Sequence, residues 1–318
     1  MDISARSYVK RPRLIVKKIS SFLRRFTGVP TKSEKLKTFH EAKQERLSTC
    51  EALAFMRHDA HRIEKAFYNN IFDAKREFYE KRRENVFKAI QLALENGVSE
   101  HEPTLVWARE IASEFEKLPE TFIKKNSISA REIDIASSDG LLKLMSTRRS
   151  SRVWSSEQPS NEELMKFALK MVEAGKWAPT SGDRQPVRFK ILLDLEEKIV
   201  LKGLKEEHCY NAPCLIFIGT DRRFYGGLGN NEAAMHVDTG AAAMQMALLA
   251  HGANFGVCWN HFSTDLIQSR SSNVEVYRNF VKMHSIPDHI EPVALLAFGR
   301  AAFYPPAPAR MNTSDYLL

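Results

Sequence analysis

The stretch NEAAMHVDTGAAAMQMALLAHGANFGVCWNHF, residues 231–262, joins a long helix-forming segment to a short apolar one. Alanine, methionine, leucine and glutamine dominate residues 231–253 and favour a helix. Residues 255–262 are rich in aromatic and apolar side chains, which favour a strand. A long helix that leads directly into a strand is typical of a layered domain that contains both kinds of element.

The residues on either side of this stretch continue the alternation. Ser160 and Glu163 form a capping box at the start of a helix that is predicted to end near Trp177. Further strands are predicted over residues 186–193, 213–220 and 291–299, and further helices over residues 195–207 and 263–284. These elements predict an α/β or α+β layered domain over residues 146–318.

The first half of the chain has a helical pattern almost throughout, and Gly97 and Pro103 are its clearest breaks. The pattern predicts helices over residues 34–56, 60–95 and 104–117, and a short helix before residue 146. We therefore divide the chain into a basic tail (residues 1–30), an all-helical extension (31–145) and the layered domain (146–318).

The composition is that of a globular protein, with 43% hydrophobic and 27% charged residues. Residues 1–30 carry eight Lys or Arg and one acid, which accounts for almost all of the net charge of +8. The remainder is nearly neutral, so we expect no nucleic-acid partner. Residues 10–26 have the pattern of a basic amphipathic helix, which predicts peripheral membrane contact, and a floppy tail is the alternative.

The four cysteines are spread along the chain and show no zinc-ligand spacing, so neither a metal site nor a disulfide framework is expected. The N-terminus lacks the apolar region of a secretory signal, and no apolar run is long enough to span a membrane. We expect a cytoplasmic protein, with the basic tail as a reason to place it at the inner face of the membrane.

The segment STRRSSRVWS, residues 146–155, places three arginines within five positions. Arginine binds phosphate well because its planar guanidinium donates two charge-assisted hydrogen bonds at once. A solvated loop is the alternative interpretation of this segment on its own.

The segment KWAPTSGDRQPVRFKIL, residues 176–192, takes the chain from a helix through a turn-rich loop into a strand. The loop offers Thr180, Ser181, Asp183 and Gln185 as hydrogen-bonding partners for a flat polar ring. An ordinary helix-to-strand connection is the alternative.

Together these segments resemble the nitroreductase family of flavoproteins. RRSSRVW (residues 148–154) matches the family's Arg-Arg-Ser-x-Arg-x-aromatic opening, and APTSGDRQP (178–186) resembles its Ala-Pro-Ser/Thr-x-x-Asn-x-Gln-Pro loop. Three later segments resemble further motifs of the family in the same order: YNAPCLIFI (210–218), HVDTGAAAMQMALLAHGANFGVCW (236–259) and AFGRAAFYPPAPAR (297–310). The resemblance covers residues 146–318.

The resemblance implies an α+β sandwich with a mainly antiparallel sheet flanked by helices, and FMN held at the interface of a homodimer. It places Trp259 and Asn260 near the flavin N5 and makes Arg310 a second phosphate ligand. The residues expected to hold the phosphate, the ribityl chain and the ring are Arg148, Arg149, Ser150, Arg152, Pro179, Thr180, Ser181, Asp183 and Gln185.

Two residues depart from the family's pattern. Asp183 stands where the family usually has Asn, so a carboxylate that can only accept hydrogen bonds replaces an amide. A carboxylate there disfavours the negative charge of reduced flavin, unless Arg184 or Arg188 neutralises it. Asn254 stands where the family often has Gly.

The extension contains its own motif, MRHDAHRIEKAF (residues 56–67). Its histidines and acids could be drawn as metal ligands, but an ion-pair network is favoured. Nitroreductase-like proteins of polysaccharide assembly resemble this chain in having a His-Arg-(Ile/Leu)-Glu-Lys helix before the flavin domain. This resemblance implies that the extension covers the active site, with His61, Arg62 and Lys65 facing substrate.

We therefore expect an FMN-dependent oxidoreductase that passes hydride from NADH or NADPH through flavin N5 to an unsaturated, nitro or quinone-like acceptor, with a link to surface polysaccharide synthesis. No catalytic nucleophile is required. The segment around GGLG (residues 226–229) is expected to be an active-site loop. Two alternatives are a flavin dehydrogenase or oxidase that acts on a biosynthetic intermediate, and a membrane-associated accessory protein with a degenerate flavin pocket.

Overall fold

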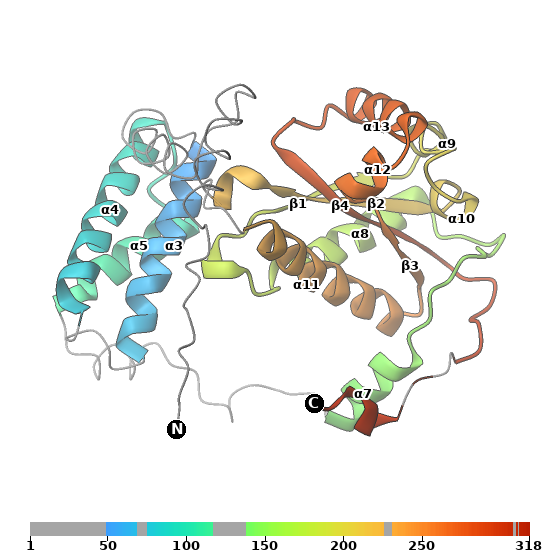
Figure 1. Ribbon diagram of the computed structural model, residues 1–318, viewed down its shortest axis with the longest axis horizontal. Helices are drawn as coiled ribbons and strands as arrows, with labels where there is room; N and C mark the ends of the chain where they lie inside the picture. Colours follow the sequence, from blue (N-terminus) through green and yellow to red (C-terminus); the bar gives the residue numbers. More distant parts are fainter. Residues whose placement is uncertain (1–48, 69–74, 117–137, 226–230, 308–309, 311) are drawn as a thin grey trace, which may run out of the picture.

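The computed structural model describes residues 49–68, 75–116, 138–225, 231–307, 310 and 312–318 (Figure 1). The basic tail over residues 1–30, its expected membrane-binding helix and the GGLG segment lie outside these residues. Within the described ranges, no helix is both long enough and apolar enough to cross a bilayer.

Three helices form the described part of the N-terminal region: α3 (Thr49–Tyr68), α4 (Arg76–Glu95) and α5 (Pro103–Ser113). The predicted boundary between two helices at residues 56–60 is wrong, because α3 runs through it without interruption. Met56, Ala60 and Ile63 are completely buried in one core cluster with residues of α4 and α5, so this stretch is held helical by packing. The predicted helix 60–95 is also not one helix, since its residues belong to the end of α3 and to α4, and residues 34–48 of the first predicted helix lie outside the described residues. The predicted helix 104–117 is confirmed by α5, which starts at Pro103 behind a cap from Glu102.

The layered domain is built on a four-stranded sheet in the order β1-β2-β4-β3, in which each neighbouring pair is antiparallel. The strands are β1 (Val187–Leu192), β2 (Cys214–Asp221), β3 (Gly256–His261) and β4 (Ile290–Gly299). All four predicted strands are therefore present. The two central strands are almost entirely buried, because helices cover both faces of the sheet.

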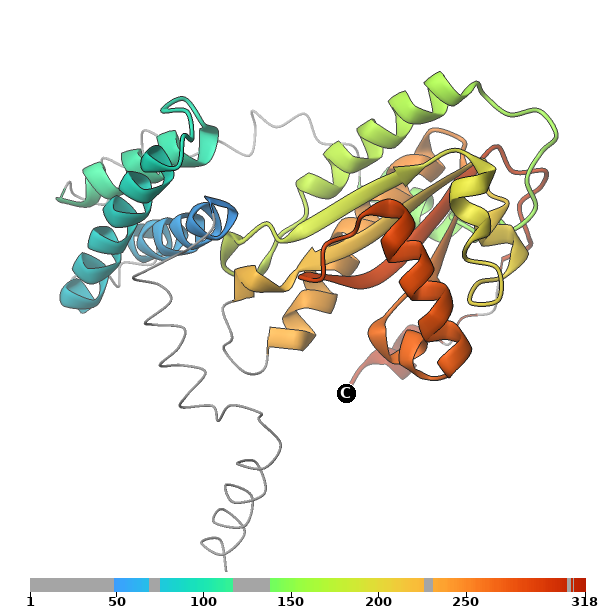
Figure 2. The same cartoon turned by 90° about the horizontal axis from the view of Figure 1, so that it is seen from above.

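Helices α8 (Asn161–Lys176) and α11 (Asn231–Gly252) cover one face of the sheet, and their side chains share a core with β2 and β4. The other face packs against α9 (Leu195–Ile199), α10 (Glu207–Tyr210), α12 (Thr264–Gln268) and α13 (Ser271–His284) (Figure 2). This three-layer arrangement confirms the predicted α+β fold.

Two predicted helices are each interrupted. The predicted helix 195–207 is helical only over α9, which ends at Ile199, and α10 begins at the predicted end, Glu207; Gly203 adopts a φ of 96° between them. The predicted helix 263–284 divides into α12 and α13 at Arg270, whose backbone is extended. The predicted capping box of α8 is confirmed, since Ser160 and Glu163 hydrogen-bond each other in both directions.

The arginine-rich segment lies beside the free edge of β3. Ser150 forms an isolated bridge with Val257, and the Ser151 amide donates to the Val257 carbonyl at 3.0 Å. Gly256 permits this approach, because a Cβ added there would lie 2.7 Å from the Cβ atoms of Ser151 and Ala301. The segment is thus attached to the sheet by close backbone packing.

Gly256→Ala is expected to force the arginine-rich segment away from β3 and to lower the free energy of unfolding by about 1–3 kcal/mol, the usual cost of overpacking. Urea unfolding measures this change. Gly252→Ala is the control, because its Cβ would meet Leu144 Cδ1 at an ordinary 3.5 Å. Equal free energies of unfolding for the two variants would show that the arginine-rich segment can move away from β3 without loss of stability.

Candidate functional site

The arginine-rich segment follows α7 (Ser138–Thr147) at the C-terminal end of α11. Thr147 Oγ1 lies 3.0 Å from His251 Nε2 on the last turn of α11. Burial lowers the pKa of His251, and repulsion from Arg148 and Arg149 lowers it further. Both guanidiniums therefore lie close to the end of this helix.

The segment has the properties of an anion site. Among the described residues, Arg148, Arg149 and Arg152 form no ion pair with a carboxylate, although Arg149 donates to the carbonyls of Ser146 and Arg148 at 2.7 and 2.9 Å. The Ser151 hydroxyl is buried there without a hydrogen-bond partner in the described structure. Unpaired guanidiniums beside an unsatisfied hydroxyl fit a phosphate group.

The loop between α8 and β1 is held in an unusual backbone conformation. Asp183 and Gln185 have positive φ values of 51° and 53°, as does Gly182 at 64°. Residues other than glycine rarely adopt the left-handed backbone conformation, and they keep it only where the surrounding structure fixes them. Residues in this conformation are concentrated at functional sites. The Gln185 amide donates to Thr180 Oγ1 at 3.1 Å, which closes the loop on itself.

Asp238 of α11 anchors this loop from below. Its carboxylate accepts from the Ser181 amide at 2.9 Å and from the Tyr225 hydroxyl at 2.6 Å. Asp238 is buried, with 4% of its surface exposed, so these two bonds replace its lost hydration. Burial and the Asp238 carboxylate raise the pKa of Tyr225, which keeps the phenol protonated as the donor. Asp238 belongs to the HVDTG segment (residues 236–240), and this anchoring role was not predicted from the sequence.

Helix α3 covers the same loop from the other side. A Cβ added to Gly182 would lie 2.5 Å from His58 Cδ2, so only glycine fits against this histidine. Arg57 donates to the Arg184 carbonyl at 3.1 Å and to Thr104 Oγ1 on α5 at 3.1 Å. Helix α3 therefore packs against this loop through Arg57 and His58, and the role expected for His61, Arg62 and Lys65 toward substrate stays a prediction.

Asp183 has a different electrostatic partner from the two that the sequence suggested. Burial lowers the pKa of Arg57, and Asp183 is the carboxylate that most strongly opposes this shift. Arg188 instead lies over the Phe224 ring, with its guanidinium carbon 4.8 Å from the centroid. Arg184 folds back onto the Ser181 carbonyl. Arg57, from a segment more than a hundred residues earlier, is therefore a positively charged group that interacts with Asp183.

We expect the contact between α3 and the loop to weaken in acid. Burial lowers the pKa of His58, repulsion from Arg184 and Arg82 acts in the same direction, and Asp59 opposes both. The contribution of His58 to stability is complete above its unfolded-state pKa of about 6.5 and is lost as the pH falls from there toward its lower folded-state pKa.

His58→Gln is expected to reduce the loss of stability between about pH 7 and pH 5, since glutamine does not titrate. Urea unfolding at the two pH values measures the difference. His61→Gln on the same helix is the control, because His61 lies next to Glu64 and does not contact the loop. An unchanged pH dependence in the His58 variant would contradict this role.

The three residues that were expected to face substrate divide into two groups. His61 Nδ1 lies 3.3 Å from Glu64 Oε2, and Arg62 and Lys65 line a cavity between α3 and α4. His58 pairs with Asp59 at 3.1 Å, and Arg82 pairs with the same carboxylate. The predicted ion-pair network is confirmed, and the described residues contain no cluster suited to a metal ion.

The remaining predicted site residues lie apart from one another. Trp259 packs beside α11, whereas the Asn260 amide hydrogen-bonds His208 at 2.9 Å and the Cys258 carbonyl at 3.0 Å. Pro179 and Arg310 are exposed. Asn254 has a φ of 60°, a conformation that asparagine tolerates better than most residues, which explains how it replaces a glycine.

The arginine-rich segment and the α8–β1 loop are associated with opposite ends of α11 (Figure 1). Asp238 holds the loop and His251 adjoins the arginines, and these two residues lie 13 positions apart, which is about 20 Å along the helix. One chain therefore does not bring the two halves of the predicted site together.

Several solved structures resemble part of this chain. A Desulfovibrio desulfuricans protein in complex with FMN is 23% identical, covers 57% of this chain and 97% of its own, and has a TM-score of 0.46. An FMN-dependent nitroreductase from Clostridium difficile is 22% identical over 55% of this chain and 93% of its own, with a TM-score of 0.42. Nitroreductase A from Vibrio parahaemolyticus is 15% identical over 57% and 76%, with a TM-score of 0.46.

No curated protein sequence matches the chain significantly. The family model described as "Nitroreductase family" matches residues 145–206 and 195–300, which include the arginine-rich segment, the α8–β1 loop and all four strands. These matches assign the layered domain of this chain to the nitroreductase family.

Proposed function

We propose that the protein is an FMN-dependent oxidoreductase that takes hydride from NADH or NADPH and delivers it to an unsaturated, nitro or quinone-like acceptor. The observation that carries this proposal is the set of arginines beside β3, which have no carboxylate partner among the described residues. FMN, when bound, would supply the hydride-transfer chemistry, and the protein positions the reactants and sets their charge.

The residues that would hold FMN form two groups, one for the phosphate and ribityl chain and one for the ring. Arg148, Arg149, Arg152 and the Ser150 hydroxyl would bind the phosphate and ribityl chain, with Arg310 as a further phosphate ligand. The α8–β1 loop would face the ring edge through Thr180, Ser181, Asp183 and Gln185, with Pro179 beside them. Its backbone is rigid because Asp238 and α3 hold it from two sides. A rigid loop needs no reordering when the reactants bind.

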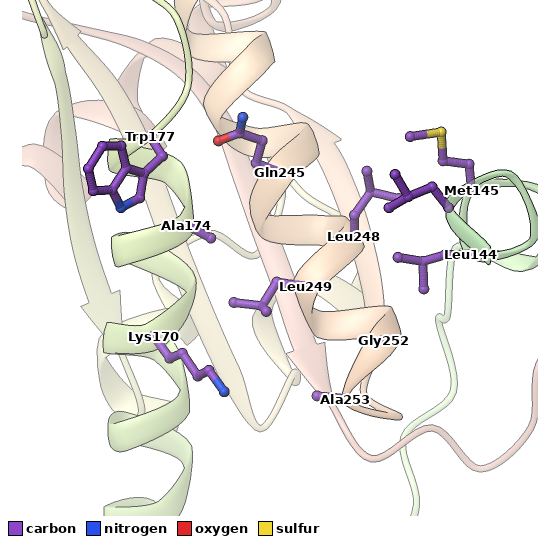
Figure 3. A pocket seen from close by; sticks show the side chains of 11 residues that line it. Leu144, Met145, Lys170, Ala174, Trp177, Gln245, Leu248, Leu249, Gly252 and Ala253 are labelled. Carbon is purple, nitrogen blue, oxygen red and sulfur yellow. The ribbon is translucent and has the colours of Figure 1, made fainter. Parts of the chain in front are cut away.

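We infer that the complete site requires a homodimer, because α11 keeps the two binding elements apart in one chain. A groove of about 650 Å³ between α7, α8 and α11 is lined mainly by apolar side chains and could receive a second copy (Figure 3). Gln245 contributes a buried side-chain oxygen to this region that lacks a partner among the described residues. Trp177 at its rim is 74% exposed, which is unusual for so large an apolar side chain.

In such a dimer, the arginine-rich segment of one copy would meet the α8–β1 loop of the other along antiparallel α11 helices. A link to surface polysaccharide synthesis and attachment to the membrane face through residues 10–26 remain parts of the proposal that rest on the sequence. The acceptor is then a biosynthetic intermediate that carries a reducible double bond or carbonyl-conjugated group.

The visible absorption spectrum of the purified protein, recorded before and after anaerobic NADPH, tests the proposal. We expect a flavin spectrum that bleaches on addition of NADPH. A flavin spectrum that persists with both NADPH and NADH would favour a dehydrogenase or oxidase that draws its electrons from another substrate. A protein that takes up no FMN on reconstitution would overturn the assignment and favour an accessory role.

A further inference from the structure

The side chain of His208 lies between α10 and the end of β3, and only 9% of it is exposed. Its Nε2 lies 2.9 Å from Asn260 Oδ1 and 3.5 Å from Cys258 Sγ. Its Nδ1 lies 3.2 Å from Oε2 of Glu206, the residue that precedes α10. Both ring nitrogens therefore have polar partners, although no motif in the sequence pointed to His208.

The hydrogen bonds of these partners decide where the ring carries its protons. Asn260 Nδ2 donates to the Cys258 carbonyl at 3.0 Å, so the amide oxygen, which can only accept, faces Nε2. Burial raises the pKa of the Cys258 thiol, and this protonated thiol donates to the Trp259 carbonyl at 3.9 Å. Glu206 presents a carboxylate, which is also an acceptor, to Nδ1. A ring that faces acceptors on both sides holds a proton on each nitrogen, so the network assigns His208 as an imidazolium.

The charged groups around this ring come from α10, the segment before it, β3 and the arginine-rich segment. Glu206 faces the ring, whereas Glu207 accepts from Asn211 and Lys205 donates to the His261 carbonyl. Glu206 is 81% exposed, so water screens its pairing with the ring, and the bond at Nε2 is the more enclosed of the two. The titratable groups that act on His208 or on the thiol beside it are Glu206, Lys205, Arg148, Arg152, Cys209 and Cys258.

The backbone of His208 binds the arginine-rich segment. Trp154 Nε1 donates to the His208 carbonyl at 3.0 Å, and Trp154 closes the run that begins with the first two arginines. At its other end the segment is attached to β3 directly, since the Ser151 amide donates to the Val257 carbonyl. The arginine-rich segment is thus attached to β3 twice, once at Val257 and once through His208 at Asn260.

We propose that His208, with a proton on each ring nitrogen, is a positioning residue that holds the arginine-rich segment against β3 for the phosphate of FMN. The inference deepens the proposed function and rests on it for the identity of the ligand. A guanidinium donates two bonds to one phosphate only from a fixed direction, so a displaced segment loses affinity. A ring that loses one proton turns a lone pair toward Glu206 or Asn260 and gives up one of its two bonds. FMN should therefore bind less tightly as the pH rises.

Fluorescence titration of the apoprotein with FMN, from about pH 7 to pH 9, tests this role while the FMN phosphate remains a dianion. His208→Ala removes the bond to Asn260 and is expected to raise the dissociation constant at least about tenfold. His208→Gln keeps a donor near the position of Nε2 but has no titrating proton. It should bind FMN as the wild type does at about pH 7 and should lose the weakening at higher pH. His101→Gln, at an exposed position between α4 and α5, is the control and should follow the wild type.

Two further measurements do not depend on FMN. Hydrogen exchange of the Ser151 amide reports whether the segment stays on β3, because this amide donates to the Val257 carbonyl. We expect faster exchange in His208→Ala than in the wild type or His208→Gln. Nitrogen-15 NMR of the wild type at about pH 7 should show both ring nitrogens of His208 protonated. A single protonated nitrogen would overturn the proposed form of the ring.

An FMN dissociation constant in folded His208→Ala equal to that of the wild type would overturn the inference, whatever the exchange rate. An equal loss of affinity in His208→Ala and His208→Gln would show general packing in place of positioning and would also overturn it. Circular dichroism checks the folding of each variant, and His208→Asn, which lacks a donor at the position of Nε2, replaces His208→Ala if that variant does not fold. If no sample binds FMN, the proposed function fails, and the exchange of the Ser151 amide alone decides whether His208 positions the segment.

Discussion

Arg148→Ala/Arg149→Ala is expected to release FMN from the protein. Hydrogen bonds to charged groups contribute about 1.5–3 kcal/mol each, so the loss of two guanidiniums should raise the dissociation constant at least about a hundredfold. Neither arginine pairs with a described carboxylate, so their removal leaves no buried charge unpaired. Flavin retained after gel filtration, measured by absorbance against protein concentration, gives the result.

Arg278→Ala/Lys282→Ala is the matched control, because both residues are exposed on α13 and the pair removes the same charge. It should retain flavin as the wild type does. Thermal unfolding of both double variants shows whether the arginine variant is still folded. Full flavin retention by a folded Arg148/Arg149 variant would contradict the proposed phosphate site.

Asp183→Asn is expected to raise the midpoint potential of bound FMN, and Arg57→Met to lower it. Reduced flavin gathers negative charge, so a nearby carboxylate disfavours reduction and a nearby guanidinium favours it. Arg57 is buried, with 8% of its surface exposed, and its guanidinium is fixed by Thr104 and the Arg184 carbonyl. A shift of about 30 mV corresponds to about 1.4 kcal/mol for a two-electron couple, and we expect changes of that order.

The double variant Arg57→Met/Asp183→Asn distinguishes a coupled pair from two independent effects. If the two charges act independently, the two opposite shifts should add, so the double variant should lie near the wild-type potential. If they are coupled, the potential of the double variant should differ from the sum of the two single shifts. Anaerobic titration against a reference dye measures all four potentials. Arg76→Met is the control on the exposed side of α4, since Arg76 pairs with Glu80 away from the loop. An Asp183→Asn potential at or below that of the wild type would show that the carboxylate does not face the ring.

The secondary structure of the layered domain could be predicted closely from the sequence. All four strands and the long helix α11 occur where apolar runs and small residues predicted them. A buried strand and a buried helix each require apolar residues at characteristic spacings, so both can be recognised in the sequence. The capping box of α8 was equally visible, since it depends on two residues three positions apart. The interruptions near Gly203 and Arg270 were missed, because helix-forming residues continue across both.

The arginine-rich segment and the α8–β1 loop were also recognisable, because each is a continuous run of residues with a distinct chemistry. The sequence did not reveal that Arg57 and His58 contact this loop. The motif at residues 56–67 lies on this helix, and Arg57 and His58 at its start are the residues whose contacts with the loop the structure describes. The side of α3 that meets the loop is set by its packing on α4 and α5.

The sequence by itself determined the fold class, the order of the elements and the two runs of residues that resemble flavin-binding motifs. These properties are local, because periodicity, capping and hydrogen-bonding chemistry are each encoded over a few neighbouring residues. Only the tertiary structure showed that Arg57 interacts with Asp183, that His58 packs against Gly182, and that α11 separates the two binding elements. Those relations join residues up to 127 positions apart, and only the packing of helices and sheet fixes the distances between them.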